Sequence, residues 1–466
     1  MVSFKPTGGR SVSLTTKENR IAFYVDGNDI PTVNFDVGPS WAGLIPVSSN
    51  ANETRELYFW FFPALKDVAK DDFIIWLNGG PGCSSLEGFL EENGPISFQY
   101  GQFQATPNPY SWTNVSNMLW VDQPVGTGFS QGTPDATSEA DVADHFIGFL
   151  EQFFSLFSEL KGKRLWITGE SYAGVYIPYI ADAIYSQPSL KDSAGINLQG
   201  IGIFDAATTY SVIQEQIPTV PFVHKWNNVL NLNQSFIASI EVSCNSANYS
   251  EKYATYPPKG PLPDGGINVT AECDIYDSVV DAATTINPCA YHIFDGCPIP
   301  YDALGFPEGE NLTLGPVFFD NPELQDAIHA PRINWTECSP GVFINDTDNS
   351  DYPSPGGAGV LTRVIDNNTR TLIGHGLLDM LLLSEGTRIM IQNLTFGGMQ
   401  GFQTPITNIL NVEGLGEMGF WHEERKLMYV EYALSGHMVA QYQPIPALKT
   451  IVSRSQRLWP GRIVHC

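Results

Sequence analysis

Short apolar runs recur along this chain and alternate with stretches of helical periodicity. Several runs stop abruptly at Gly, Asp or Asn, as buried strands of an α/β sheet do before the loops at their carboxyl edge. The pattern predicts an α/β fold with a central, mostly parallel sheet flanked by helices. The expected strands are Leu57–Phe62, Phe73–Leu77, Met118–Val121, Leu165–Thr168, Ile201–Phe204, Thr371–Ile373 and Leu427–Tyr432.

The clearest predicted helix is the segment SEADVADHFIGFLEQFFSLF, which begins at Ser138. Ser138 and Asp141 form a capping signature, and apolar residues such as Val142, Phe146 and Phe149 then recur at helical spacing. We expect this helix to pack on the sheet. Regular structure is expected to resume near DNPELQDAIHA, where a proline suits the start of a helix.

The segment from about residue 206 to 310 breaks the alternation, because it contains four cysteines and the turn-rich run YPPKGPLPDGG. We therefore expect residues 1–205 to form the first part of the core and residues 311–466 the second part. Residues 206–310 would form an inserted cap subdomain with disulfides over the carboxyl edge of the sheet. The four cysteines allow three pairings, and Cys466 is the candidate for a free thiol. The four are Cys244, Cys273, Cys289 and Cys297.

Composition supports a large core and excludes several classes of function. Of the 466 residues, 43% are hydrophobic and 16% are charged. Acidic residues outnumber basic ones by 50 to 24, which argues against nucleic acid because phosphate binding needs a basic surface. We expect no membrane span, because no run of about 18 apolar residues is present. Without a C-x-x-C pair a zinc site is not expected, and we expect no metal and no cofactor.

Ten N-x-S/T sequons, together with several cysteines, favour a protein of the secretory pathway. The alternative is chance occurrence in a chain rich in Asn and Thr. The N-terminal segment MVSFKPTGGRSVSL has no apolar signal-peptide core. We expect a processed form that is secreted, or alternatively delivered to an acidic vacuole or lysosome-like compartment. The candidate glycosylation sites are Asn52, Asn114, Asn233, Asn248, Asn268, Asn311, Asn334, Asn345, Asn367 and Asn393.

The strongest chemical signal lies in LWITGESYAG, where an apolar run leads into G-x-S-x-x-G. This is a variant of the nucleophile elbow of α/β-hydrolases, in which small residues let the strand and the next helix approach closely. The helix expected from about Ala173 to Ile184 would direct its N-terminus at Ser171 and favour negative charge there. An ordinary strand-to-helix turn is the alternative for this motif alone.

A serine nucleophile needs a base and an orienting acid, and in this fold the chain order is serine, acid, histidine. Asp379 lies in LIGHGLLDM and His437 in YALSGHMVAQYQP, which completes the order after Ser171. His375 is the rival base, but it precedes the acid. One oxyanion donor is expected at the backbone of Tyr172 and another in FIIWLNGGPGCSS. That loop has no Walker pattern, which argues against phosphate binding.

Five sequence blocks together resemble the serine carboxypeptidases, the family of carboxypeptidase Y and cathepsin A, and secreted fungal members look most similar. The blocks are WLNGGPGCSS, EENGP, DQPVGTGFS, ITGESYAGVYIP and SGHMVAQYQP, and they occur in the family's order over nearly the whole chain. The resemblance implies an α/β-hydrolase fold and release of C-terminal residues from peptides and proteins through an acyl-enzyme.

The resemblance also implies a role for each matching residue. Glu92 is preferred to Glu91, because the family has one residue between the acid and Gly-Pro. The implied roles are Ser171 as nucleophile, His437 as base, Asp379 as orienter, Gly80 and Tyr172 as oxyanion donors, Asn78, Gly79, Glu170 and Glu92 as the site for the substrate's free carboxylate, Met438 on the leaving-residue side, and Cys83 with Cys338 as a disulfide.

Glu170 suits a carboxylate-binding role only if it shares a proton. Two carboxyl groups in contact cannot both ionise cheaply, so one keeps its proton and donates a hydrogen bond. An acidic pH optimum follows as a hypothesis. The alternative is that Glu170 is a solvated turn residue.

Three departures from the family pattern leave the catalytic groups intact but put the specificity pockets in doubt. They are Leu377 in place of a first acid before Asp379, Gly202-Ile203-Phe204 in place of Gly-Asn-Gly, and Ala440 in place of proline.

Rival functions are an acyltransferase using the same triad, an esterase or lyase acting on a small molecule, and an inactive binding protein. Glu170 favours hydrolysis, and the complete triad argues against the binding protein.

Overall fold

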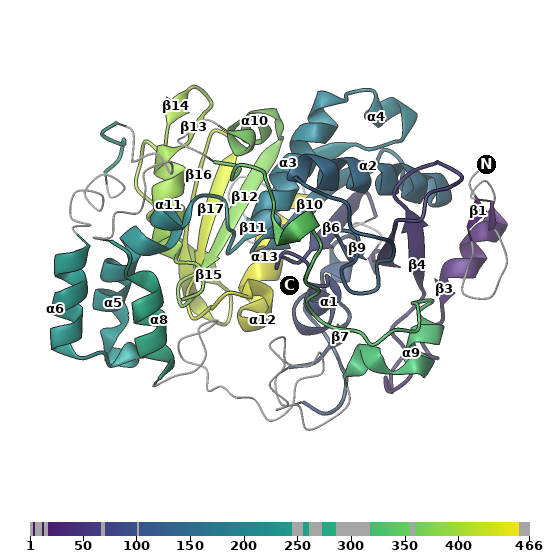
Figure 1. Cartoon of the computed structure of the whole chain (residues 1–466), viewed down its shortest axis with the longest axis horizontal. Helices are drawn as coiled ribbons and strands as arrows, with labels where there is room; N and C mark the ends of the chain where they lie inside the picture. The colour runs from purple at the N-terminus through teal and green to yellow at the C-terminus, as the bar shows by residue number, and fades with distance from the viewer. Residues whose placement is uncertain are drawn as a thin grey trace.

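The computed structural model describes residues 3–4, 12–13, 17–66, 70–99, 102–244, 255–260, 273–285, 317–354 and 359–455. Its centre is an 11-stranded sheet with the strand order β15-β16-β17-β12-β11-β10-β6-β9-β5-β4-β3 (Figure 1). The strands from β9 to β17 in this order pair in parallel, and the strands outside them pair antiparallel. The predicted mostly parallel sheet is therefore confirmed. The strands of this sheet are β3 (Tyr24–Val25), β4 (Ser40–Pro46), β5 (Glu56–Phe62), β6 (Asp72–Leu77), β9 (Asn117–Val121), β10 (Arg164–Glu170), β11 (Leu198–Phe204), β12 (Arg370–Gly376), β15 (Asn408–Val412), β16 (Gly416–Glu424) and β17 (Leu427–Tyr432).

All seven predicted strands are present, and they are apolar because both faces of the sheet are covered. In β5 the side chains of Phe59 and Phe61 enter one apolar cluster, whereas those of Tyr58 and Trp60 enter another on the opposite face. Successive side chains of a strand point to opposite faces, so one run of large apolar residues serves two cores.

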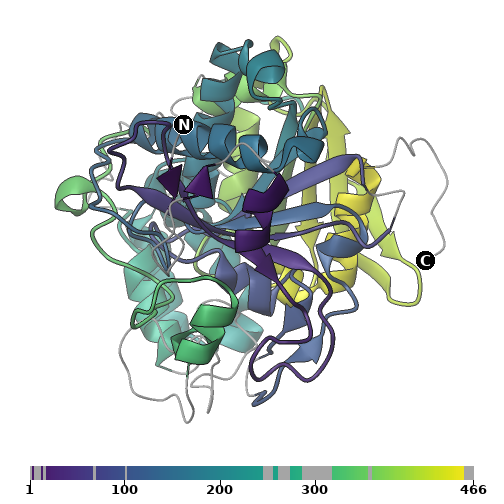
Figure 2. The ribbon, with the colours of Figure 1, turned by 90° about the vertical axis from the view of Figure 1, so that its right-hand side faces the viewer.

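Helices cover both faces of the sheet (Figure 2). The predicted capping box between Ser138 and Asp141 is present at the start of α2. On one face the apolar cluster includes α2 (Glu139–Leu156), α3 (Ala173–Ser186), α10 (Val360–Asn367) and α11 (Ser384–Asn393). On the other face it includes α1 (Leu86–Glu91), α9 (Pro322–Ala327), α12 (Val439–Tyr442) and α13 (Pro444–Ser455). Shorter elements are β1 (Ser3–Phe4), β2 (Val12–Ser13), η1 (Lys17–Phe23), β7 (Ile96–Ser97), β8 (Thr106–Pro107), η3 (Trp112–Asn114), η4 (Ser158–Leu160), α4 (Leu190–Ser193), η5 (Val212–Gln216), η6 (Phe318–Asp320), η7 (Ile344–Asp346), β13 (Thr395–Phe396) and β14 (Met399–Gln400).

Three helices between β11 and β12 form a separate apolar cluster at one end of the molecule (Figure 1). They are α5 (Ile217–Leu230), α6 (Gln234–Ser243) and α8 (Tyr276–Thr284). The cluster includes Leu378 and Met380, and the Tyr276 hydroxyl donates to the carbonyl of Met380 at 2.8 Å. These helices therefore pack on the loop that follows β12. We propose residues 206–310 as the inserted cap, of which residues 245–254, 261–272 and 286–310 lie outside the described part.

A disulfide joins Cys244 to Cys273 within this region. Cys273 is thus the partner of Cys244 among the three that the sequence allows. Cys289, Cys297 and Cys466 lie outside the described residues. A second disulfide joins Cys83 to Cys338, as the family resemblance implies.

The described helices include none that is both long enough and apolar enough to cross a bilayer.

Of the sequons, Asn248, Asn268 and Asn311 lie outside the described residues. The side chain of Asn393 is buried at 5% exposure, which disfavours a glycan there, and Asn114 is half-buried. The exposed candidates are Asn52, Asn233, Asn334, Asn345 and Asn367.

Candidate active site

The nucleophile elbow forms at the end of β10. Ser171 has a φ of 57°, a left-handed conformation that is uncommon outside glycine. Its N–H donates to the carbonyl of Phe204 at 3.0 Å. A Cβ on Gly169 would lie 2.1 Å from the carbonyl oxygen of Leu77, and one on Gly174 would lie 2.6 Å from the Cβ of Ala206. The two glycines of the motif are therefore required by close packing.

The acid and the base of the predicted triad meet. Asp379 follows β12, and His437 follows β17, the neighbouring parallel strand. His437 Nδ1 lies 2.8 Å from Asp379 Oδ2, and both side chains are buried. When Nδ1–H donates to the carboxylate, Nε2 is left without a hydrogen and can accept the proton of a serine hydroxyl.

The carboxylate of Asp379 is held in its ionised form. Its Oδ1 accepts the backbone N–H groups of Leu381 at 2.8 Å and Leu382 at 3.2 Å. Burial alone would raise the pKa of Asp379, but the charge of His437 and hydrogen bonds with His375 and His437 lower that pKa to about 2. A permanent negative charge at this position stabilises the imidazolium that forms during proton transfer.

The rival base, His375, is occupied elsewhere. Its side chain is fully buried on β12, where Nε2 lies 2.8 Å from the carbonyl oxygen of Leu382. Its Nδ1 lies 2.9 Å from the Thr387 hydroxyl. Nε2 is also 3.5 Å from the carboxylates of Asp379 and Asp205. His375 thus supports the acid, which leaves His437 as the candidate base.

The two expected oxyanion donors adjoin the elbow. A Cβ on Gly79 would lie 2.5 Å from the backbone nitrogen of Tyr172 and 2.7 Å from the Cβ of Ser171, so only glycine fits there. Gly80 follows with a φ of 110°. Neither the Gly80 nor the Tyr172 N–H donates to any atom of the described residues. Two backbone N–H groups without protein acceptors are what a developing oxyanion requires.

Asn78 organises a buried polar cluster next to the elbow. It is 1% exposed, and its Nδ2 donates to Glu170 Oε1 at 3.2 Å and Glu87 Oε2 at 3.1 Å. Its Oδ1 accepts from Trp76 Nε1 at 2.7 Å and from the Gly88 N–H at 3.2 Å. These bonds fix the amide orientation, so that the side chain donates toward the acids.

Glu170 and Glu92 form a buried pair of carboxyl groups. Each is 3% exposed, and burial, followed by the charge of nearby carboxylates, holds both pKa values well above the ordinary range for a glutamate. Glu91 is turned away, with its Oε2 accepting from Gln441 at 2.9 Å. The pair therefore retains a proton at pH values where exposed glutamates are ionised, and a protonated carboxyl can donate a hydrogen bond.

The place of Met438 on the leaving-residue side stays a prediction, whereas the disulfide implied by the resemblance is present. Met438 directly follows His437 and is 2% exposed. The Cys83–Cys338 disulfide ties the glycine-rich loop to the segment beginning at Cys338. This linkage also brings residues 339–348 next to the elbow.

Sequence reasoning missed two acids of the site. Glu87 lies in the first turn of α1, where an acid is an ordinary helix-start residue. Asp205 is fully buried beside Asp379, and its only signal is its place directly after a buried strand.

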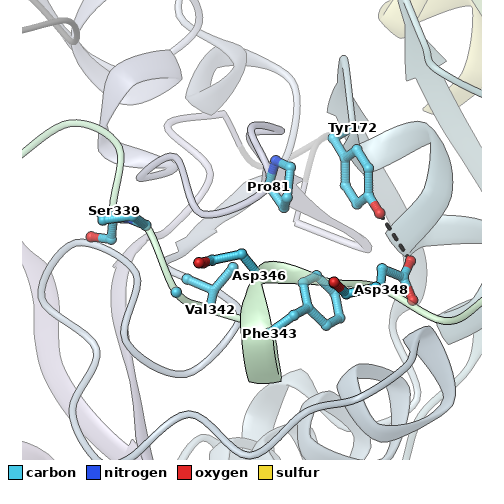
Figure 3. Close-up of a pocket in the computed structure, with 10 residues that line it drawn as sticks. Pro81, Tyr172, Ser339, Val342, Phe343, Asp346 and Asp348 are labelled. Carbon is cyan, nitrogen blue, oxygen red and sulfur yellow. Dashed lines mark hydrogen bonds between the residues drawn. The ribbon is translucent and has the colours of Figure 1, made fainter.

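A cavity of about 430 Å³ lies beside the elbow (Figure 3). Pro81, which follows Gly80, and the ring of Tyr172 form part of one wall, and Asp346 and Asp348 form part of another. The Tyr172 hydroxyl donates to Asp348 Oδ2 at 2.9 Å. The cavity is thus lined by Tyr172, the residue after Ser171, and has an acidic wall.

Comparisons with known proteins agree on one family. A family model described as serine carboxypeptidase matches residues 31–455. A probable serine carboxypeptidase of Arthroderma benhamiae is 44% identical over 451 residues, covering 91% of this chain and 84% of the relative. Serine-type carboxypeptidase F of Aspergillus niger is 41% identical, covering 89% and 83%. Among solved structures, the prohormone-processing carboxypeptidase Kex1 of Saccharomyces cerevisiae has a similar fold, with a TM-score of 0.73 at 22% identity over 93% of this chain and 96% of that one.

Proposed function

Because the chain belongs to the serine carboxypeptidase family, we propose that Ser171, His437 and Asp379 carry out the hydrolysis. The protein is a serine-type carboxypeptidase with an α/β-hydrolase fold. The observation that supports these roles most strongly is the 2.8 Å contact between His437 and Asp379, on loops at the same sheet edge as the elbow.

The proposed reaction has two halves. His437 takes the proton of the Ser171 hydroxyl as its oxygen attacks the last peptide carbonyl, and the N–H groups of Gly80 and Tyr172 stabilise the oxyanion. The C–N bond then breaks, and His437 returns the proton to the departing amino acid. Water next attacks the acyl-enzyme with His437 again as base, which releases the shortened peptide and restores Ser171.

We propose that four residues restrict cleavage to the last peptide bond of the substrate: Asn78, Gly79, Glu170 and Glu92. The substrate's free carboxylate would accept a hydrogen bond from one of the Asn78 N–H groups, which donate to Glu87 and Glu170 in its absence. It would accept further hydrogen bonds from a backbone N–H and from the shared proton of the two acids. An internal peptide bond presents no carboxylate and would place a chain where the buried acids lie. This arrangement explains why an acid stands next to a nucleophile.

We propose an acidic pH optimum for peptide cleavage. The pKa values of Glu170 and Glu92 are raised, so the shared proton is present at acidic pH and is lost as the pH increases. The ionised pair would repel the substrate's carboxylate, so KM should rise with pH. A KM for a peptide acid that stays constant up to pH 8 would contradict this mechanism.

The test of the overall proposal is a time course on a mixed-sequence peptide, followed by mass spectrometry. We expect a ladder of products that differ by one C-terminal residue at each step. Fragments from internal bonds, or from the N-terminus, would contradict an exopeptidase.

The acidic cavity beside Tyr172 is proposed to receive the residue that precedes the cut bond. No described Lys or Arg pairs with Asp346 or Asp348. A peptide ending in Lys-Leu should therefore lose its leucine about five times faster than one ending in Glu-Leu. Asp346→Asn should narrow this ratio. Equal rates for both peptides in the unmodified enzyme would remove the cavity from substrate selection.

Residence in the secretory pathway is likewise a proposal. Two disulfides and five exposed sequons in the described residues support it. Protein made in a eukaryotic secretory host should lose apparent mass on treatment with an N-glycan-cleaving enzyme. An unchanged mass would contradict the proposal.

A further inference from the structure

Asp205 occupies a fixed place between the nucleophile and the triad acid. It directly follows β11, which lies between β10 and β12 in the sheet. Its φ is 43°, and its N–H donates to the Gly374 carbonyl at 3.0 Å. Its Oδ1 accepts the Gly376 N–H at 2.8 Å, and its side chain is fully buried. Both the backbone and one carboxyl oxygen are therefore held by β12.

The second carboxyl oxygen of Asp205 has no donor. No N–H or O–H group of the described residues donates to Oδ2. One carboxyl oxygen of Asp205, one of Asp379 and one ring nitrogen of His437 lie within 4.8 Å of one another. A buried ionised carboxyl with an unpaired oxygen, facing a second carboxylate, is costly. A proton on Oδ2 removes the charge and turns the orphaned oxygen into a donor.

The proton belongs on Asp205 rather than on its neighbour. The pKa of Asp379 is about 2, because two histidines stabilise its charge against the effect of burial. Burial, followed by the charge of Asp379, raises the pKa of Asp205 well above the ordinary range. His375 Nε2 is 3.5 Å from both carboxylates, and it already lies 2.8 Å from the carbonyl of Leu382.

More distant charges act in the same direction. The carboxyl groups of Glu92 and Glu170 oppose a negative charge on Asp205. Among the described residues, His437 also lies near Asp205, and its Nδ1 is engaged with Asp379.

We infer that Asp205 is a positioning residue that stays protonated and donates a hydrogen bond from Oδ2 to the carboxylate of Asp379. The inference deepens the proposed triad and rests on it. The carboxylate of Asp379 then has donors on several sides: His437, the backbone of residues 381 and 382, and Asp205. This further contact fixes the plane of the carboxylate, and with it the ring of His437.

A pH dependence follows from the titration of Asp205. As the pH rises, the proton is lost and two buried carboxylates repel each other. The orientation of Asp379 is then disturbed, which lowers the rate of the chemical step. The effect should appear in kcat, whereas loss of the Glu170–Glu92 proton should appear in KM.

The test uses a neutral organophosphorus ester that phosphorylates active-site serines with loss of its leaving group, because such a reagent needs no carboxylate site. Labelling rates of the unmodified enzyme, Asp205→Asn and Asp205→Ala are measured from pH 4 to pH 9 at saturating reagent. The amide of Asp205→Asn donates without ionising, so it should keep the acidic-pH rate within about three-fold and lose the alkaline decline. Asp205→Ala should be about ten-fold slower than the unmodified enzyme at acidic pH, as expected for loss of one hydrogen bond to a charged group. Because it has no carboxyl group to ionise at this position, the difference should close as the pH rises.

Thermal unfolding of the same proteins keeps the proposal testable if Asp205→Ala does not fold. The folded pKa of Asp205 exceeds its unfolded value, so its stability contribution is present below the unfolded pKa of about 3.9 and is lost as the pH rises. The Tm of Asp205→Asn minus the Tm of the unmodified enzyme should therefore increase as the pH increases.

The possible results separate a failure of the role of Asp205 from a failure of the proposed triad. Identical pH profiles for labelling and Tm in Asp205→Asn and the unmodified enzyme would overturn the role of Asp205. A reagent that labels the unmodified enzyme but not at Ser171 would instead overturn the triad. An Asp205→Ala enzyme as fast as Asp205→Asn would show that the donated hydrogen bond is unnecessary.

Discussion

Ser171→Ala is expected to lower kcat for peptide hydrolysis by about 10⁴-fold or more, because no other member of a triad replaces a lost nucleophile. His437 would then have no hydroxyl to deprotonate, and no acyl-enzyme would form. The remaining rate would come only from the oxyanion donors and from substrate positioning. The measurement is the initial rate of release of the C-terminal amino acid, with enzyme purified away from host peptidases.

The fold should tolerate this change. Ser171 is only half-buried, and its backbone N–H and carbonyl form the elbow's hydrogen bonds. Tm should therefore change by about 2 °C or less. Ser239→Ala is a matched control, because Ser239 is exposed on α6 and donates only to the Phe236 carbonyl. It should retain full activity. Unchanged turnover in Ser171→Ala would exclude Ser171 as the nucleophile.

The strands that the sequence predicts share one property, which is burial on both faces. The run at Leu57–Phe62 is apolar throughout and the run at Leu427–Tyr432 is apolar except for Glu431, and that is why both are recognisable without a structure. The strand β4 was missed because its sequence, SWAGLIP, contains glycine and proline. The strand β16 was missed because it lies near the sheet edge, where half-exposed polar residues hide the alternation.

The catalytic elbow was predictable because close packing demands particular residue types. Gly169 and Gly174 leave no room for a Cβ, so the packing constraint appears directly in the sequence. The family resemblance supplied the choice of Glu92 over Glu91. The structure supplies its reason: Glu91 ends α1 and Glu92 caps it, so their side chains point in different directions, toward Gln441 and Glu170 respectively.

The role of Asp205 could not be predicted in the same way. An aspartate after a strand is also an ordinary strand-ending residue. What distinguishes it is the proximity of Asp379, a residue far away in sequence, and the lack of a donor to Oδ2. Both features arise only when β11 and β12 pair. The link between Cys244 and Cys273 is of the same kind, since spacing alone permits several partners.

The second large expected effect concerns the substrate's free carboxylate. A blocked dipeptide with a free C-terminus should be cleaved at pH 5 with a kcat/KM about 100-fold or more above that of the same compound amidated. Hydrogen bonds to a charged group contribute about 1.5–3 kcal/mol each, so losing one or two of them gives a factor of this size. The Asn78 amide and the proton shared by Glu170 and Glu92 are the donors concerned.

The preference for a free C-terminal carboxylate over an amide should also depend on pH. The raised pKa values of Glu170 and Glu92 mean that the shared proton is present at pH 5 and is lost at higher pH. The ionised acids would repel the free carboxylate but accept a hydrogen bond from a C-terminal amide, so the ratio should fall as the pH rises. Glu170→Gln is the matched control, because its amide keeps a donor that does not titrate. For this variant, the ratio of kcat/KM for the free acid to that for the amide should change less with pH.

The central claim is that a serine triad operates beside a pocket that binds a peptide's free C-terminus. The ratio of kcat/KM for the free acid to that for the amide, measured for the unmodified enzyme from pH 5 to pH 8, tests that claim most directly. We predict a ratio of about 100 or more at pH 5 that declines toward pH 8. A ratio near one at every pH would contradict the account, because the buried acids beside Ser171 would then have no part in choosing the substrate.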